Sequence, residues 1–233
     1  MQAGAATTLP QLANHALRRG LAGAEFLVAI PGSVGGGVRM NAGAHGSQIS
    51  DILSRVVIFD LAALTLVERP ATKLGLGYRA SALSDLEVVV EAGFELEPGD
   101  AGSIRKRMDD YRRHRAETQP GAAQNAGSVF KNPPGDSAGR LVEACGLKGF
   151  RIGAASVSEL HANFFMAGPG ASAQDVYDLV GAVRQRVEAA TGIELECEIR
   201  FVGPFGPSAE TGGSAAATQP SQVDGCRRGP QCA

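Results

Sequence analysis

A glycine-rich segment near the start of the chain restricts the possible folds more than any other feature of the sequence. It runs from Ile30 to Gly43, in a chain that holds 31 Gly among its 233 residues. Glycine allows positive φ and lets the backbone approach a ligand closely. Exposed backbone N–H groups in such a loop can hold phosphate or the polar edge of a flat cofactor ring. An ordinary glycine-rich turn is the competing interpretation, and composition alone leaves both open.

Composition and charge exclude several classes of protein. Hydrophobic residues make up 44% of the chain, which is enough for a core, and 22 Lys+Arg against 24 Asp+Glu leave a charge of -2. Binding to nucleic acid or a membrane surface by bulk attraction is therefore not expected. No apolar run approaches the roughly 18 residues of a membrane span, and no signal peptide is visible at the start. We expect a soluble, cytoplasmic, monomeric protein.

The first half of the chain alternates helical and strand patterns. Thr8 and Gln11 have the spacing of a capping box, and Gly20 is suited to end the helix that they open. Strand-like runs follow at Arg55–Leu61, Leu64–Glu68 and Val88–Leu96, the first two close enough to form a hairpin. Residues 100–119 predict a helix whose many basic side chains form a solvated face.

A second ordered block extends over residues 128–202. It contains a short helix between Asp136 and Gly146, a longer helix from Ser172 to Gly192, and a strand over Glu194–Val202 with alternating apolar and charged residues. From residue 204 to 233 small and polar residues dominate, which is typical of a disordered tail. The pattern as a whole predicts an α+β fold.

Some familiar chemistries do not fit the sequence. No CxxC motif and no histidines at metal-ligand spacing are present, so we expect no metal site. Matches to G-x-G-x-x-A at Gly75–Ala80 and Gly168–Ala173 lack the strand or the backbone donors of a dinucleotide fingerprint. Ser128 has no histidine nearby in the sequence and no nucleophile elbow, so a hydrolase triad is disfavoured, while a serine that supplies a proton remains open.

Taken together, several short segments are similar to those of the UDP-N-acetylenolpyruvoylglucosamine reductase family, flavoenzymes that make UDP-N-acetylmuramate for bacterial peptidoglycan. No single segment is diagnostic, but the ordered set is specific and covers about residues 5–203. The matching stretches, in the family's order, are Ile30–Gly36, Asn41–Gly43, Gly77–Ser81, Gly127–Pro133, Ala138–Ala144, Gly146–Gly149, Gly153–Glu159, His161–Phe164 and Leu195–Arg200.

The resemblance implies a domain organisation and a reaction. Residues 1–99 would be the C-terminal part of an FAD-binding domain of the vanillyl-alcohol-oxidase type, residues 100–203 an α+β substrate-binding domain, and residues 204–233 the disordered tail. In this family NADPH reduces FAD, and the enolpyruvyl group of UDP-N-acetylglucosamine enolpyruvate is then reduced by hydride at C3 and a proton at C2. The short spacing from Ser128 to Glu198 is similar to that of members without an extra tyrosine-bearing loop.

The resemblance also implies roles for individual residues. Arg79 matches the arginine that holds the substrate carboxylate, Ser128 the serine that protonates C2, and Glu198 the carboxylate that works with the arginine. Tyr78, Lys131 and Asn132 match positions near the substrate. The flavin-site positions are Ile30, Pro31, Gly32, Ser33, Gly35, Gly36, Asn41, Ala42 and Gly43. A fixed guanidinium beside a developing enolate stabilises charge in the manner of an oxyanion hole.

One difference from the family leaves two interpretations open. An Arg-x-Gly-Gly strand and a Gly-Gly-Gly-Ser-Asn phosphate loop of the family do not occur in this sequence. We therefore expect the flavin pyrophosphate site to be incomplete and FAD binding to be weak or absent. The leading interpretation is a flavin-dependent reductase. The alternative is a truncated, non-catalytic remnant that at most binds a UDP-sugar, and a generic nucleotide-binding domain is a weaker third.

Overall fold

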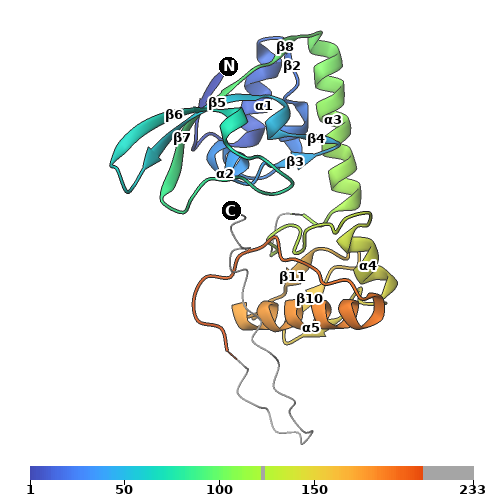
Figure 1. Cartoon of the computed structure of the whole chain (residues 1–233). Helices are drawn as coiled ribbons and strands as arrows, with labels where there is room; N and C mark the ends of the chain where they lie inside the picture. The colour runs from blue at the N-terminus through green and yellow to red at the C-terminus, as the bar shows by residue number, and fades with distance from the viewer. Residues whose placement is uncertain (122–123, 207–233) are drawn as a thin grey trace, which may run out of the picture. The chain divides into compact units, whose positions relative to one another are not determined.

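The computed structural model describes residues 1–121 and 124–206 of the chain. It divides into two compact units, Met1–Glu117 and Thr118–Ala233. Both units combine helices with antiparallel strands, so the predicted mixture of helix and sheet is confirmed (Figure 1). Most of the predicted disordered tail, residues 207–233, lies outside the described part of the chain.

A four-stranded antiparallel sheet forms the centre of the N-terminal unit. Its order is β1 (Gln2–Gly4), β7 (Glu87–Phe94), β5 (Leu53–Asp60) and β6 (Thr65–Pro70). The predicted hairpin is confirmed, since β5 and β6 pair from Asp60↔Thr65 to Arg55↔Pro70. Away from the helices, the β5–β6 hairpin and β7 extend outward (Figure 1).

Helices and short strands cover the sheet and complete this unit. Helix α1 (Leu9–Arg18) starts at the predicted capping box, because Thr8 accepts from the Gln11 N–H and Gln11 accepts from the Thr8 N–H. Its apolar face packs into the unit's core, where Leu9, Leu12 and Leu27 are fully buried. The remaining elements are β2 (Leu21–Ala22), η1 (Glu25–Ala29), β3 (Gly43–Ala44), β4 (Ser47–Gln48), η2 (Ile49–Asp51), η3 (Ala71–Lys73) and β8 (Glu97–Pro98).

The glycine-rich segment is not the continuous loop that the sequence predicts, because a short helix, α2 (Val34–Arg39), lies inside it. Ser33 caps this helix by accepting from the Gly36 N–H. Glycine is a poor helix former, but here packing prevails over intrinsic preference. A Cβ on Gly37 would come within 2.7 Å of Ile49 Cδ1, so only glycine allows this close contact with the core.

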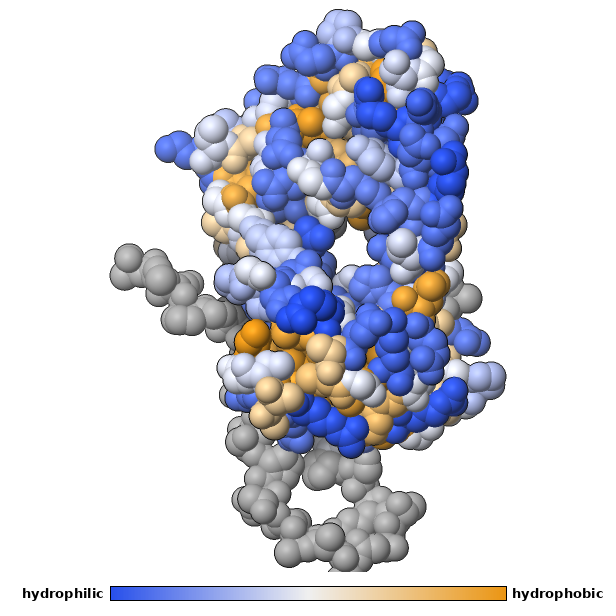
Figure 2. Space-filling model, turned by 90° about the vertical axis from the view of Figure 1, so that its right-hand side faces the viewer, coloured by the Kyte–Doolittle hydropathy of each residue, from blue (hydrophilic) through white to orange (hydrophobic). Residues whose placement is uncertain are grey.

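Helix α3 (Ala101–Thr118) belongs to the N-terminal unit. The sequence-based boundary at residues 99/100 assigns this helix to the second domain, whereas the structure divides after Glu117. Ile104 and Met108 are buried in the core of the N-terminal unit, and Arg107 pairs with the buried Glu25. Most other side chains of α3 are exposed as predicted, although Tyr111 packs against the core and Arg115 donates to the Ala29 carbonyl. Figure 2, which looks onto that side, shows mostly hydrophilic residues over this unit.

The C-terminal unit packs two helices against a small sheet. Helix α5 (Ala173–Thr191) lies against the antiparallel strands β9 (Arg151–Ile152), β10 (Ala155–Val157) and β11 (Phe165–Ala167) (Figure 1). Its predicted ends are confirmed, with Ser172 as N-cap and Gly192 in the left-handed conformation after the last turn. The short helix predicted after Asp136 is α4 (Ala138–Ala144).

The predicted strand over Glu194–Val202 is only partly right. This stretch forms an isolated bridge between Cys197 and Phe130, with bends after it, instead of a regular strand. Its alternation is real, because Leu195 is fully buried while Glu194 and Glu196 are exposed. Its backbone bonds to residues 129–131 join Glu196 to Lys131 and residues 198 and 199 to Val129.

No helix within residues 1–121 and 124–206 is both long and apolar enough to cross a bilayer.

Candidate functional site

Arg79 lies in a tight turn of the N-terminal unit. Gly77 and Ala80 exchange backbone hydrogen bonds of 3.1 and 3.3 Å across this turn, which places Arg79 at a φ of +52°. Its guanidinium donates to the Gly43 carbonyl at 3.0 Å and lies 5.0 Å from the ring centre of the half-exposed Tyr78. The predicted carboxylate-binding arginine therefore touches the predicted cofactor segment.

Asn41 connects the same two segments from inside the protein. Its side chain is fully buried; its amide nitrogen donates to the Gly77 carbonyl at 2.9 Å and to Gln48 Oε1 at 3.1 Å, and its oxygen accepts from the Ser50 N–H at 2.9 Å. The hydrogen-bonding capacity of this side chain is thus used within the unit. Its φ of +41° suits asparagine, which tolerates the left-handed region better than most residues.

The glycines of the predicted flavin segment fall into two groups. A Cβ on Gly35 would lie 2.9 Å from Ala5 Cβ, and one on Gly43 would lie 2.7 Å from the Ser47 carbonyl oxygen, so both are required by internal packing. Gly32 and Gly36 are exposed, with no atom nearer than 3.5 Å to a built Cβ. The backbone at these two positions is open, which fits the close approach of a cofactor to this edge.

The other predicted flavin-site residues flank this helix. Pro31 is exposed and Ile30 half-buried at the entry to the segment, while Ala42 packs against the core. Ser33, the N-cap of α2, already uses its hydroxyl oxygen on the helix. Any cofactor contact from Ser33 would therefore add to its capping bond.

A ring cluster closes the end of this segment. The His45 ring stacks on Tyr111 at 4.0 Å between ring centres and meets His114 edge-on at 5.6 Å. Burial lowers the pKa of His45, and the nearby charges of His114 and Arg115 lower it further. These contacts fix the β3–β4 turn against α3.

Ser128 lies on an extended segment in the C-terminal unit. Ser128 bridges Phe164 on one side of the segment, and Phe130 bridges Cys197 on the other. The segment holding the predicted proton donor is thus the middle one of three. Backbone pairing on both sides restricts its motion, as in a central strand.

Glu198 lies beside this segment. Its backbone N–H donates to the Val129 carbonyl at 2.8 Å, so the predicted serine and the predicted carboxylate are carried by directly paired backbones. Both residues are half-buried. Arg79 belongs to the N-terminal unit, whereas Ser128 and Glu198 belong to the C-terminal unit.

Lys131 and Asn132 follow Ser128 and have structural partners. The Lys131 ammonium pairs with Glu196 Oε1 at 2.5 Å, and its backbone N–H donates to the Glu196 carbonyl at 2.8 Å. Asn132 Oδ1 accepts from the Ala138 N–H at 3.0 Å at the start of α4. Both positions therefore link the serine segment to neighbouring elements.

Asn163 contacts the serine segment, and no role is assigned to it from the sequence. Its side chain forms hydrogen bonds with the N–H and the carbonyl of Phe130, and Asn163 is only 3% exposed. His161, two residues earlier, accepts from the Asn163 N–H at 3.2 Å through Nδ1. Burial lowers the pKa of His161. The only sequence signal is that both residues lie within the His161–Phe164 stretch.

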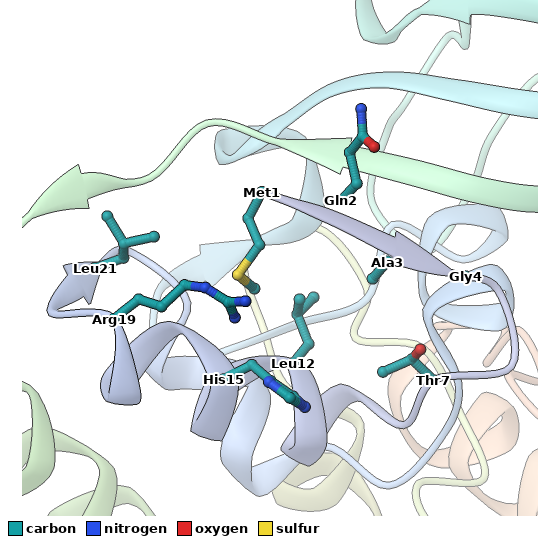
Figure 3. A pocket seen from close by; sticks show the side chains of 9 residues that line it. All are labelled: Met1, Gln2, Ala3, Gly4, Thr7, Leu12, His15, Arg19 and Leu21. Carbon is teal, nitrogen blue, oxygen red and sulfur yellow. The ribbon is translucent and has the colours of Figure 1, made fainter.

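A pocket of about 500 Å³ lies elsewhere in the N-terminal unit, between β1 and α1. Met1, Leu12 and Arg19 point into the space between these two elements (Figure 3). Its lining shares no residue with the predicted catalytic, cofactor or substrate positions. In the part of the chain that the structure describes, no group of three His, Cys, Asp or Glu side chains is arranged to hold a metal.

The chain is a two-unit α+β protein, with an open glycine edge beside an arginine turn in one unit and the segment of Ser128 paired with that of Glu198 in the other. Residues 119–202 match the family described as UDP-N-acetylenolpyruvoylglucosamine reductase, C-terminal domain. A reductase of this name from Heliobacterium modesticaldum is 44% identical over 216 residues, which cover 92% of this chain and 68% of the relative. The chain belongs to the UDP-N-acetylenolpyruvoylglucosamine reductase family, as its resemblance predicts.

Two further comparisons agree. The reductase of the same name from Trichlorobacter lovleyi is 45% identical over 191 residues, covering 82% of this chain and 63% of the relative. The crystal structure of UDP-N-acetylenolpyruvylglucosamine reductase from Thermus caldophilus matches with a TM-score of 0.77 and 39% identity, covering 85% of this chain and 71% of that chain. The chain thus spans about two thirds of the length of its relatives.

Proposed function

We propose that this protein reduces the enolpyruvyl group of UDP-N-acetylglucosamine enolpyruvate to give UDP-N-acetylmuramate. Bound FAD supplies the hydride chemistry, with NADPH as the source of the hydride. The exposed backbone at Gly32 and Gly36, with Pro31 and Ser33, would hold the flavin on the N-terminal unit. The backbone at Gly32 and Gly36 carries no side chain, so a flavin could approach it closely, and this supports the assignment.

In this proposal Arg79 binds the substrate carboxylate. A guanidinium presents two parallel N–H donors to a carboxylate and stays charged at every physiological pH. When the substrate double bond accepts hydride at C3, negative charge develops toward C2 and the carboxylate. Arg79 stabilises that charge without reorganising, because its turn is tied to Asn41 and Gly43.

Ser128 then delivers the proton to C2, and Glu198 assists at the developing charge. The observation that carries the proposal is the direct backbone pairing of Glu198 with Val129, the neighbour of Ser128. A hydroxyl is a weak acid, but a carbanionic carbon is a strong base, so the transfer is favourable. Tyr78, Lys131 and Asn132 would contact the rest of the substrate.

Separate measurement of the two half-reactions tests this function. The full chain is saturated with FAD, reduced anaerobically by NADPH, and mixed with UDP-N-acetylglucosamine enolpyruvate while flavin absorbance is followed. We expect Ser128→Ala to leave reduction by NADPH unchanged and to slow reoxidation by substrate by orders of magnitude. Equal loss in both half-reactions would contradict the proton-donor role.

Ser137→Ala is the matched control. It removes a hydroxyl from the same unit, at the N-cap of α4, where Ser137 accepts from the Arg140 N–H. It should lower stability by about 1 kcal/mol and leave both half-reactions unchanged. A wild-type chain that binds UDP-N-acetylglucosamine enolpyruvate but neither FAD nor NADPH would establish the non-catalytic alternative instead.

A further inference from the structure

The segment that carries Ser128 depends on a single side chain from another part of the unit. Five backbone groups between Val129 and Lys131 have recorded partners: the N–H and C=O of Val129, the N–H and C=O of Phe130, and the N–H of Lys131. Residues 196–199 supply partners to the Val129 carbonyl and the Lys131 N–H. Asn163 supplies the partners of the other three.

Asn163 does this by acting as a substitute for the backbone. Its own carbonyl accepts from the Val129 N–H at 2.8 Å. Its side-chain oxygen accepts from the Phe130 N–H at 2.9 Å, and its side-chain nitrogen donates to the Phe130 carbonyl at 2.8 Å. A side-chain amide carries the same donor and acceptor as a peptide group, so it extends the pairing by one residue.

The pairing geometry explains why a side chain is needed. Phe130 faces Cys197 in an isolated bridge whose hydrogen bonds belong to the flanking residues, Val129 to Glu198 and Lys131 to Glu196. The polar groups of Phe130 therefore point away from residues 196–199. Phe130 is 1% exposed, so without Asn163 these groups would be buried and unsatisfied.

The orientation of the amide is fixed by its partners. A backbone N–H requires an acceptor and a carbonyl requires a donor, so a flipped amide would oppose like groups at both contacts. The backbone of Asn163 is itself held, because its N–H donates to His161 Nδ1 at 3.2 Å. We call the two side-chain bonds from Asn163 to Phe130 the clamp. The clamp is held at Phe130 by these two bonds and at Asn163 by the bond to His161.

We propose that Asn163 is a positioning residue for the reaction: it fixes the backbone of Phe130 and, through it, the placement of Ser128 and Lys131 relative to Glu198. This inference rests on the proposed function for its catalytic consequence, while its structural part stands on the hydrogen bonds alone. In this proposal, Asn163 is assigned no contact with the substrate. Its effect is transmitted only through the segment that it holds.

The variant Asn163→Asp tests the role of the side-chain bonds to Phe130, because its effect should be reversed by lowering the pH. The carboxylate keeps an acceptor for the Phe130 N–H but turns a second acceptor toward the Phe130 carbonyl, so the clamp is broken while the group is ionised. Protonation restores a donor at that position, and burial favours the neutral form. Lowering the pH from 8 to 5 should therefore restore both side-chain bonds to Phe130 in this variant, and wild type measured at both pH values corrects for the titration of His161, which accepts from the residue-163 N–H. Asn163→Leu removes both side-chain bonds at every pH.

Amide hydrogen exchange of the full chain measures the clamp directly. We expect the protection factor of the Phe130 amide to fall at least tenfold in Asn163→Leu, and in Asn163→Asp at pH 8 with recovery at pH 5. The Lys131 amide, which donates to Glu196, reports the fold of the neighbouring pairing. Unchanged Phe130 protection in both variants would overturn the proposal.

The half-reactions measure the catalytic consequence. Reoxidation of the reduced flavin by substrate should slow at least tenfold in Asn163→Asp at pH 8, relative to wild type at the same pH, and recover at pH 5, while reduction by NADPH stays unchanged. Asn14→Asp is the control, because Asn14 also bonds a backbone carbonyl, that of Pro10 at 2.8 Å, in the other unit. It should show no such reversal.

The two arms separate the possible failures. A wild-type chain without substrate turnover would refute the proposed function, and the exchange arm would still decide whether Asn163 holds Phe130. Lost Phe130 protection with a normal rate of flavin reoxidation would overturn the positioning role. Loss of both half-reactions together, without recovery at low pH, would also overturn it, because that is the result of general unfolding.

Discussion

The Asn41 side chain donates to the Gly77 carbonyl at 2.9 Å and thereby joins the glycine-rich segment to the turn that carries Arg79. These residues are 36 positions apart in the sequence. A second bond, from the Arg79 guanidinium to the Gly43 carbonyl at 3.0 Å, spans the same two segments. The predicted carboxylate-binding residue and the predicted cofactor segment are therefore one structural element, held together by a buried amide.

Replacing Asn41 should destabilise this element strongly. Asn41→Ala removes one of the two bonds to the Gly77 carbonyl, removes the acceptor of the Ser50 N–H, and places alanine at a φ of +41°. We expect the free energy of unfolding to fall by about 2 kcal/mol. Urea unfolding followed on amide signals of the N-terminal unit measures it. Asn14→Ala, which removes a bond to the Pro10 carbonyl and a long, exposed bond from Arg112, should cost less than half as much.

Adjacent glycines of α2 should respond to the same substitution with opposite signs. A Cβ on Gly37 would meet Ile49 Cδ1 at 2.7 Å and Leu9 Cδ2 at 3.1 Å, so Gly37→Ala should destabilise the unit by about 1–3 kcal/mol. Gly36 is exposed, and its nearest neighbour is Ser33 Oγ at 3.5 Å. Gly36→Ala should therefore stabilise the unit by about 0.5–1 kcal/mol. Thermal unfolding of the two variants side by side decides this; equal shifts would refute it.

Elements set by local chemistry could be predicted from the sequence. The capping boxes at Thr8 and Ser172 and the left-handed residue Gly192 are read within a few residues, and the helices begin and end there. Helix α2 could not be predicted, because glycine has a low helix propensity and the reason for the helix is the distant contact of Gly37 with Ile49. Tertiary packing decides that segment.

In the candidate site, too, some residues could be predicted from local sequence, whereas others depend on contacts between distant residues. The residues matched to the family could be named from short motifs, and the pairing of Glu198 with Val129 brings the segments of two of them together. Asn163 could not be assigned a role, because its function depends on contact with Phe130, 33 residues away. A single buried asparagine has no periodicity or motif of its own. Only the three-dimensional pairing reveals what it holds.

The buried ion pair on α3 should contribute to the stability of the N-terminal unit. Glu25 is 7% exposed; it accepts from Arg107 and from the Gly23 N–H. Burial raises the pKa of Glu25, but the bonds from Arg107 and the backbone outweigh it and the net shift is downward. Arg107→Met leaves the carboxylate without its cation, at an expected cost of about 1–2 kcal/mol, since the half-exposed guanidinium admits water.

A neighbour on the same helix provides the control for Arg107. Arg113 pairs with Asp110 at 3.2 Å, and both side chains are exposed to solvent. Arg113→Met should change the free energy of unfolding by less than about 0.5 kcal/mol. Chemical denaturation of both variants at pH 7 makes the comparison. Similar decreases in the free energy of unfolding for the two variants would mean that any positive charge on α3 stabilises the unit, and that the contact of Arg107 with Glu25 has no special effect.

His161 should make the stability of the C-terminal unit depend on pH. Burial lowers its pKa below the ordinary value of 6.5, and its Nδ1 must stay unprotonated to accept from the Asn163 N–H. The folded state therefore binds a proton less readily than the unfolded state. Its stabilising contribution is complete above about pH 6.5 and is lost as the pH falls toward the folded-state pKa. Lowering the pH from 7.5 to 5 should reduce the free energy of unfolding.

His161→Gln isolates this contribution, because glutamine offers an acceptor that does not titrate in this range. The pH dependence of urea unfolding, followed on amide signals of the C-terminal unit, should be shallower in His161→Gln than in wild type. His15→Gln, on α1 in the other unit, is the control for removing a histidine without touching the Asn163 N–H. His45 also has a lowered pKa, but it lies in the other unit and is present in both proteins, so the difference between the curves belongs to His161. Parallel curves for wild type and His161→Gln would show that the Asn163 N–H does not require an unprotonated ring.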